Sequence, residues 1–124
     1  ICMQKSPRIL IVDDLSSARK VLGRLLSSLG YDNQIMAANG AEALQALEQN
    51  SVDLIISDWV MPEMDGIELL KEIRNRGFNL PFLMITSEAK KDRVTAALEA
   101  GVTDYICKPL DSKTLGEKVI KHTK

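Results

Sequence analysis

Five short apolar runs are spaced along the chain. They lie at Ile9–Val12, Gln34–Ala37, Leu54–Ser57, Phe82–Ile85 and Tyr105–Cys107. The first, third and fourth runs are apolar at every position up to Val12, Ile56 and Ile85. Such continuous runs are typical of strands that are buried on both faces of a sheet. We therefore predict five strands at these places.

Apolar residues recur at helical spacing between the runs. After the first run they stand at i, i+3, i+4, i+7, i+8 and i+11, on one side of a predicted helix: Ala18, Val21, Leu22, Leu25, Leu26 and Leu29. Gly30 follows as a C-cap. Four shorter sets predict further helices, of which the second and third end at Gly77 and Gly101: Leu44 and Leu47; Leu69, Leu70 and Ile73; Val94, Ala97 and Leu98; Leu115, Val119 and Ile120.

Five repeats of a strand followed by a helix predict an α/β fold. Right-handed crossovers would place the strands in one parallel sheet with helices on both faces. A length of 124 residues suits one domain, because domains most often have about 100–150 residues. We expect residues 1–7 to form an N-terminal tail and residues 8–124 to form the domain.

Composition and charge exclude several classes of protein. Hydrophobic residues make up 45% of the chain and the net charge is -1, so no basic field favours direct contact with nucleic acid or an anionic membrane. No run of 18 apolar residues and no signal-peptide pattern is present. Cys2 and Cys107 form neither a disulfide framework nor a metal motif, and Cys107 is expected in the core. These features predict a soluble, cytoplasmic protein in a reducing compartment.

Polar side chains follow four of the predicted strands. Asp13 and Asp14 come directly after the first strand, Asp58 after the third, Thr86-Ser87 after the fourth and Lys108-Pro109 after the fifth. In an open parallel sheet, ligands bind outside the carboxyl ends of the strands. We therefore expect three carboxylates, a hydroxyl and an ammonium group to meet at one edge of the sheet.

Three adjacent carboxylates repel one another by several kcal/mol per close pair at an effective dielectric of about 20. Either some of them take up protons or a cation binds among them. Hard cations such as Mg²⁺ prefer oxygen ligands, and the absence of His and Cys here argues against zinc. Lys108 and Thr86 could contact phosphoryl oxygens, and a carboxylate such as Asp58 can itself attack phosphorus. The pattern indicates phosphoryl transfer to Asp58.

Each residue also has a simpler interpretation. Asp13-Asp14 could be an N-cap of the following helix, and Asp58 an ordinary residue at the end of a strand. Thr86 could be a β-branched strand residue, and Lys108 a solvated side chain in a turn. The functional interpretation rests on their occurrence together. His122, near the end of the chain, is expected to be solvated.

The five positions together resemble the receiver domains of bacterial response regulators. Two stretches, Asp58–Gly66 and Ile85–Lys91, are similar to those of the chemotaxis members of this family, and the resemblance spans about Arg8 to Lys121. It implies a flavodoxin-like (βα)5 fold with strand order 2-1-3-4-5. It also implies a phosphorylation-activated switch, and not an enzyme, that assists its own phosphorylation and dephosphorylation.

The resemblance implies a metal and phosphoacceptor site. Asp58 would accept a phosphoryl group from a phosphohistidine on a partner histidine kinase. Asp14 and Asp58 would bind Mg²⁺ directly, with Asp13 acting through water and the backbone carbonyl of Val60 as a further ligand.

The resemblance also implies a switch. Lys108 would contact the phosphoryl group through a loop with a cis bond to Pro109, while Thr86, with Ser87 beside it, moves toward the phosphate. Tyr105 would then turn inward, although it could also be a fixed surface residue. A target protein would bind the face made by the fourth helix, fifth strand and fifth helix, around Lys90, Lys91 and Tyr105, although the lysines could equally be a solvated helix start.

Two positions depart from the chemotaxis pattern. Val60 replaces an Asn and Ser87 replaces an Ala, so Val60 and Glu88 would tune the rate of dephosphorylation. A stand-alone chemotaxis-type receiver is the first hypothesis. The alternative is the receiver of a larger regulator with a DNA-binding or enzymatic output domain. A phosphatase with an aspartate nucleophile is disfavoured, because such enzymes need a second acid where Val60 stands.

Overall fold

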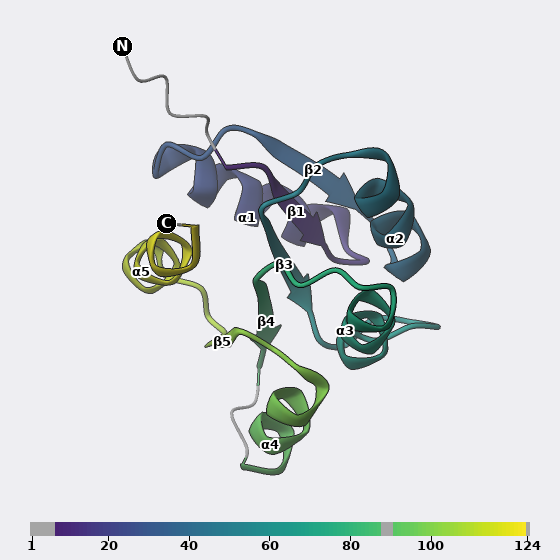
Figure 1. Cartoon of the computed structure of the whole chain (residues 1–124). Coiled ribbons are helices and arrows are strands. Elements are labelled where there is room, and N and C mark those ends of the chain that lie inside the picture. The colour runs from purple at the N-terminus through teal and green to yellow at the C-terminus, as the bar shows by residue number, and fades with distance from the viewer. Residues whose placement is uncertain (1–6, 88–90, 124) are drawn as a thin grey trace.

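The computed structural model describes residues 7–87 and 91–123, except for the side chains of residues 91–94. Five parallel strands form one sheet in the order β2-β1-β3-β4-β5. Both the predicted α/β fold and the strand order are confirmed (Figure 1). The strands run as follows: β1, Ile9–Val12; β2, Gln34–Ala37; β3, Leu54–Asp58; β4, Phe82–Thr86; β5, Asp104–Cys107.

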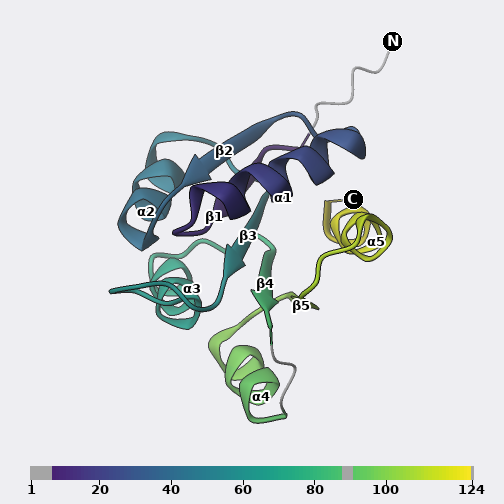
Figure 2. The same ribbon diagram turned by 180° about the vertical axis from the view of Figure 1, so that it is seen from behind.

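Helices cover both faces of the sheet, as Figures 1 and 2 show from opposite sides. On one face lie α1 (Ser16–Ser28) and α5 (Ser112–Thr123). On the other lie α2 (Gly40–Gln49), α3 (Gly66–Asn75) and α4 (Lys91–Ala100). All five predicted helices are present, and each follows one of the five strands that the apolar pattern indicated.

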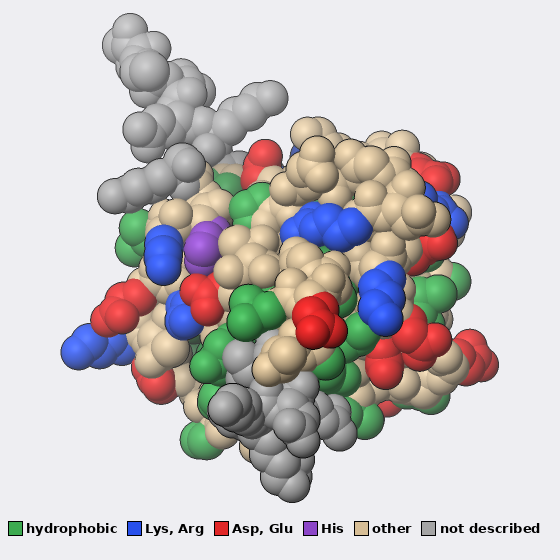
Figure 3. Space-filling model, turned by 60° about the horizontal axis from the view of Figure 1, so that its bottom comes forward, with side chains coloured by type: hydrophobic (Ala, Val, Ile, Leu, Met, Phe, Trp, Pro, Cys, Tyr) green, Lys and Arg blue, Asp and Glu red, His purple; other side chains and the backbone are tan. Residues whose placement is uncertain are grey.

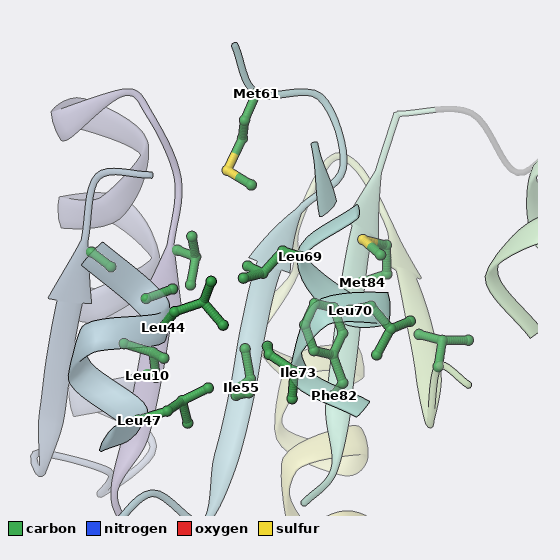
Figure 4. Packing of buried hydrophobic residues seen from close by; sticks show 14 of the residues in the cluster. Leu10, Leu44, Leu47, Ile55, Met61, Leu69, Leu70, Ile73, Phe82 and Met84 are labelled. Carbon is green, nitrogen blue, oxygen red and sulfur yellow. The ribbon is translucent and has the colours of Figure 1, made fainter. Parts of the chain in front are cut away.

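The core consists of two apolar clusters separated by the sheet. Successive residues of a strand point to opposite faces, so Leu10 packs toward α2 and α3 whereas Ile9 and Ile11 pack toward α1 and α5. Figure 4 shows the first cluster, in which Phe82 lies beside residues of α3. Every residue of β1, β3 and β4 is buried, which explains the continuous apolar sequences of β1 and of the first three or four residues of β3 and β4.

Four apolar residues predicted to face the core are exposed. Val21 is 53% exposed, Leu29 36%, Leu98 61% and Ile120 47%. Leu29 is the C-cap of α1. The other three lie at the margins of their helices' apolar stripes, and spacing alone does not determine which margin meets the sheet. The residues of α1 that are buried are Leu22, Gly23 and Leu26, so its contact with the sheet is narrower than the sequence pattern suggested.

Gly66, the first residue of α3, fixes that helix against the end of β3. Its N–H donates to the carbonyl of Trp59 at 2.8 Å. A Cβ added at Gly66 would lie 2.6 Å from the Asp58 carbonyl oxygen and 3.0 Å from the Trp59 Cα. These are backbone atoms, so the helix and the strand would have to separate.

Gly66→Ala is therefore expected to lower the free energy of unfolding by about 1–3 kcal/mol, as overpacking does. Gly116→Ala is the matched control, because a Cβ there would lie 3.4 Å from the Leu29 Cδ2 atom and remove the flexibility of a mid-helix glycine. It should raise stability by about 0.5–1 kcal/mol. Urea denaturation measures both, and equal effects would contradict the close contact.

Candidate functional site

Three carboxylates converge at the carboxyl edge of the sheet. Asp13 and Asp14 follow β1, and Asp58 is the last residue of β3. One carboxylate oxygen from each lies within 4.8 Å of the others. Asp13 and Asp58 are only 7% and 8% exposed, so little water screens their charges. The face around this edge carries acidic and basic side chains close together, with hydrophobic ones between them (Figure 3).

Asp13 and Asp14 do not cap α1, so the N-cap interpretation is wrong. The N-cap is Leu15, and no side chain caps this helix end. The Asp13 carboxylate accepts a hydrogen bond from the Leu15 N–H at 3.0 Å, while Arg19 donates to the Asp13 backbone carbonyl at 2.6 Å. The turn between β1 and α1 thus holds the Asp13 side chain toward the sheet edge, and Arg19 is a supporting contact that the sequence pattern did not indicate.

Lys108 brings the positive charge into the site. Its Nζ lies 3.3 Å from Asp58 Oδ1, and the same oxygen accepts a hydrogen bond from the Trp59 N–H at 3.0 Å. The Lys108 backbone N–H donates to the Thr86 carbonyl at 2.8 Å, and the Lys108–Pro109 peptide bond is cis. Since the Lys108 side chain is 43% exposed, its charge matters more for a bound anion than for stability.

Burial raises the pKa of the Asp13 carboxyl above its usual value. The hydrogen bond from Leu15 opposes this shift, and the negative charges of Asp58 and Asp14 reinforce it. A group with a raised pKa in the folded state favours folding when protonated, and this contribution is lost as pH rises through the folded pKa. The ionised Asp13 side chain therefore destabilises the metal-free protein at neutral pH.

Asp13→Asn is expected to raise the free energy of unfolding at neutral pH in the presence of a chelator. The amide removes the buried charge, so the advantage over the wild type should shrink in acid, where the wild-type carboxyl is protonated. Urea denaturation across pH measures the difference. Asp32→Asn, at an exposed loop position, controls for the loss of one negative charge. A gain that does not depend on pH would contradict the electrostatic cause.

The donor set suits Mg²⁺. All three side chains offer oxygen, the ligand that hard cations prefer. Their 4.8 Å spread is slightly wider than the roughly 4 Å between opposite ligands of a magnesium octahedron. One carboxylate acting through a water molecule would fit this spread.

The other predicted site residues lie around this centre. Thr86 is the last residue of β4 and is 5% exposed, whereas Val60 is 67% exposed in the loop after β3. Ser87 is exposed. Lys91 begins α4, while Glu88 and Lys90 lie outside the described residues.

Tyr105 is half-buried on β5 and packs against the apolar cluster between the sheet and helices α2, α3 and α4. Lys118 of α5 lies with its Nζ 5.6 Å from the centre of the Tyr105 ring. Cys107, predicted in the core, is exposed, because β5 forms one edge of the sheet and ends at the surface.

A polar cluster joins β5 to α5, and the sequence pattern did not indicate it. Asp104 accepts from Lys118 Nζ at 2.7 Å, lies 3.1 Å from His122 Nε2, and accepts from the Tyr105 N–H at 2.9 Å. His122 is thus half-buried and paired, and the expectation that it is solvated is wrong. Burial raises the pKa of Asp104, but these hydrogen bonds outweigh burial, and the net pKa lies below the usual value.

Among the described residues, no helix combines the length and the apolar character needed to cross a membrane. This agrees with the absence of long apolar runs in the sequence.

Comparisons with known proteins agree with this geometry. The family description "Response regulator receiver domain" matches residues 9–120. The chain is 45% identical over 121 residues to the chemotaxis protein CheY-3 of Vibrio cholerae, covering 96% of this chain and 93% of that protein. It is 43% identical over 116 residues to the chemotaxis protein CheY of Pseudomonas aeruginosa, covering 92% and 94%.

Solved structures show the same fold. The chemotaxis protein CheY4 of Vibrio cholerae superposes with a TM-score of 0.89 at 32% identity, over 95% of this chain and 99% of that one. A response regulator from Chloroflexus aurantiacus gives 0.89 at 35% identity, over 96% and 98%. The chain therefore belongs to the response-regulator receiver family, whose CheY-like members are phosphorylation-dependent signalling switches that bind Mg²⁺ at an acidic pocket.

Proposed function

We propose that residues 8–124 form a receiver domain in which Asp58 accepts a phosphoryl group from a phosphohistidine on a partner histidine kinase. The observation that carries the proposal is the position of Asp58. Its carboxylate is buried, lies among the Asp13 and Asp14 carboxylates, and has the Lys108 ammonium 3.3 Å away. Positioning and charge neutralisation supply most of the catalysis in phosphoryl transfer, and these four side chains provide both.

In this proposal Asp58 is the nucleophile. One carboxylate oxygen attacks phosphorus, and the bond from phosphorus to the donor breaks. Lys108 binds a phosphoryl oxygen and offsets its negative charge. Asp13, Asp14, Asp58 and the Val60 carbonyl would hold Mg²⁺, which when bound neutralises charge on the carboxylates and the phosphoryl oxygens.

Thr86 would convert the new phosphoryl group into a change of shape. Its position at the end of β4, buried and joined through its carbonyl to Lys108, supports this role. A ligand shifts an equilibrium only through differential affinity, and the Thr86 hydroxyl would meet the phosphoryl oxygen only in one arrangement. With Ser87 beside it, Thr86 would move inward, and Tyr105 would follow. The α4–β5–α5 face, around Lys90, Lys91 and Tyr105, would then bind the target protein.

A direct experiment tests the phosphoacceptor. The chain is incubated with Mg²⁺ and acetyl phosphate, and its intact mass is measured. We expect one phosphoryl group per chain, and none when a chelator removes the metal. Failure to take up a phosphoryl group at any Mg²⁺ concentration would overturn the proposal.

A stand-alone chemotaxis-type receiver is the first candidate for the output, because the chain is 45% identical to the chemotaxis protein CheY-3. The receiver of a larger regulator is the second. Solved receivers described as domains of a histidine kinase and of an HD domain-containing protein superpose with TM-scores of 0.85 and 0.88, at 33% and 29% identity.

Val60 would set the lifetime of the phosphorylated state. An attacking water must lie in line with the bond from phosphorus to Asp58, and Val60, 67% exposed beside Asp58, offers it no polar contact. Val60→Asn is expected to accelerate dephosphorylation several-fold, since one polar contact is worth about 1 kcal/mol. The loss of the phosphoryl group is followed over time after the donor is removed.

Val60→Thr is the control, because Thr keeps the branched shape of Val and its hydroxyl lies closer to the backbone than the amide of Asn. The Mg²⁺ affinity should be the same in all three proteins, since the backbone carbonyl is retained. An Asn variant that keeps its phosphoryl group as long as the wild type would show that position 60 does not position the water. The contribution of Glu88 would then be measured.

A further inference from the structure

A cavity of about 300 Å³ lies between α1 and the segment that follows β5. Its walls are largely aliphatic and come from α1, β4 and the segment after β5: Ala18, Val21, Leu22, Ile85 and Leu110. Polar groups line the remainder, namely Asp13, Ser17 and Lys108. The volume is at the lower end of the range for small-molecule sites, about 300–1,000 Å³.

The cavity and the phosphorylation site share two residues. Asp13 and Lys108 line the cavity, and both also belong to the group around Asp58, with Lys108 3.3 Å from its carboxylate. A small molecule with an anionic head at Lys108 could therefore lie with an apolar tail along α1. Val21 is exposed because its side chain faces the cavity and not the sheet.

We propose that this cavity binds the acyl chain of an aliphatic acyl phosphate, so that donors with longer acyl chains are preferred in the direct phosphorylation of Asp58. The inference rests on the proposed function of Asp58. A carboxylate oxygen of Asp58 attacks phosphorus, the bond between phosphorus and the acyl oxygen breaks, and the electron pair leaves with the carboxylate product. No additional proton or redox partner is required. Lys108 binds the anionic head, and the aliphatic walls select the tail.

Selection by the walls gives a quantitative expectation. Each methylene moved from water to an apolar surface is worth about fourfold in affinity or rate. Acetyl phosphate has a single methyl group, whereas butyryl phosphate has two further methylenes. The second-order rate constant for phosphorylation should therefore rise from acetyl to propionyl to butyryl phosphate, by about sixteenfold overall.

The experiment measures phosphorylation of the full chain with the three donors at a fixed Mg²⁺ concentration. Ala18→Leu places extra side-chain volume in the cavity, and it should reduce the ratio of the butyryl to the acetyl rate to near one. Ala41→Leu makes the same change at an exposed position of α2, outside the cavity, and should keep the wild-type ratio. A ratio that is unchanged in Ala18→Leu would overturn the inference.

A binding measurement without Mg²⁺ covers the case in which Ala18→Leu does not fold. The probe is 2-oxopentylphosphonate, in which a methylene replaces the bridging oxygen of butyryl phosphate. We expect it to shift the methyl NMR signals of Val21, Leu22 and Leu110, with Leu44 of the opposite cluster as an unaffected reference. Shifts confined to other residues would place the acyl chain elsewhere.

The outcomes separate this inference from the proposed function. Equal rates with all three donors would overturn the acyl-chain site and leave Asp58 as the phosphoacceptor. Absence of phosphorylation with every donor would overturn the function of Asp58 itself.

Discussion

Replacing Asp58 by Asn is expected to abolish phosphorylation. The amide has nearly the same shape as the carboxylate but lacks a nucleophilic oxygen and a negative charge. The variant therefore cannot attack phosphorus, and its 3.3 Å contact with Lys108 is no longer an ion pair. After incubation with Mg²⁺ and acetyl phosphate, the intact mass of the variant should remain that of the unmodified chain. The wild type should gain one phosphoryl group.

Asp32→Asn is the matched control, because it makes the same chemical change at an exposed loop residue. It should be phosphorylated at the wild-type rate. Undiminished phosphorylation of Asp58→Asn would show that another residue is the acceptor. Peptide mapping would then locate it.

Replacing Asp14 by Ala is expected to weaken Mg²⁺ binding by at least about tenfold, because losing even a group that only supports a metal ligand costs about tenfold to hundredfold. Fewer negative oxygens remain to hold an ion that keeps much of its hydration shell. Trp59 can report the binding, since its side chain is buried and its backbone N–H donates to Asp58 Oδ1. A fluorescence titration with Mg²⁺ gives the affinity directly.

Excess Mg²⁺ distinguishes the roles of the two aspartates. Phosphorylation of Asp14→Ala should recover as the Mg²⁺ concentration rises, because Asp58 is intact. Phosphorylation of Asp58→Asn should not recover at any concentration. An Asp14→Ala variant with the titration curve of the wild type would remove Asp14 from the metal site.

The fold was predictable because the central strands are buried on both faces. All residues of β1, β3 and β4 are buried. Apart from the polar residues at the ends of β3 and β4, these strands are continuous apolar runs, which are visible in the sequence without knowledge of any contact. The location of the site was predictable for the same reason. Once Asp13, Asp58 and Lys108 are assigned to the ends of parallel strands, the topology places them at one edge.

The exposure of side chains at the margins was not predictable. The helical spacing of Val21 matches that of Leu22, yet only Leu22 is buried, because the neighbouring segment after β5 leaves a cavity beside Val21. Cys107 is exposed because its strand, β5, lies at the edge of the sheet. Which strand lies at the edge depends on the order of the strands, which the local sequence does not give. His122 finds its partner on β5, 18 residues earlier, and no local pattern encodes that pairing.

The pairing of Asp104 with Lys118 and His122 has a consequence for how the structure opens. Within the sheet, β5 is bonded only to β4, and an edge strand with one neighbour is easily lost. Here the Asp104 carboxylate of β5 contacts Lys118 and His122 of α5 and also accepts from the Tyr105 backbone N–H. The last strand and the last helix therefore form one cooperative unit for local unfolding. Because the pKa of Asp104 is lowered, acid removes this coupling as the carboxylate is protonated. The C-terminal unit would then separate from the rest of the sheet before the β1–β3–β4 core unfolds.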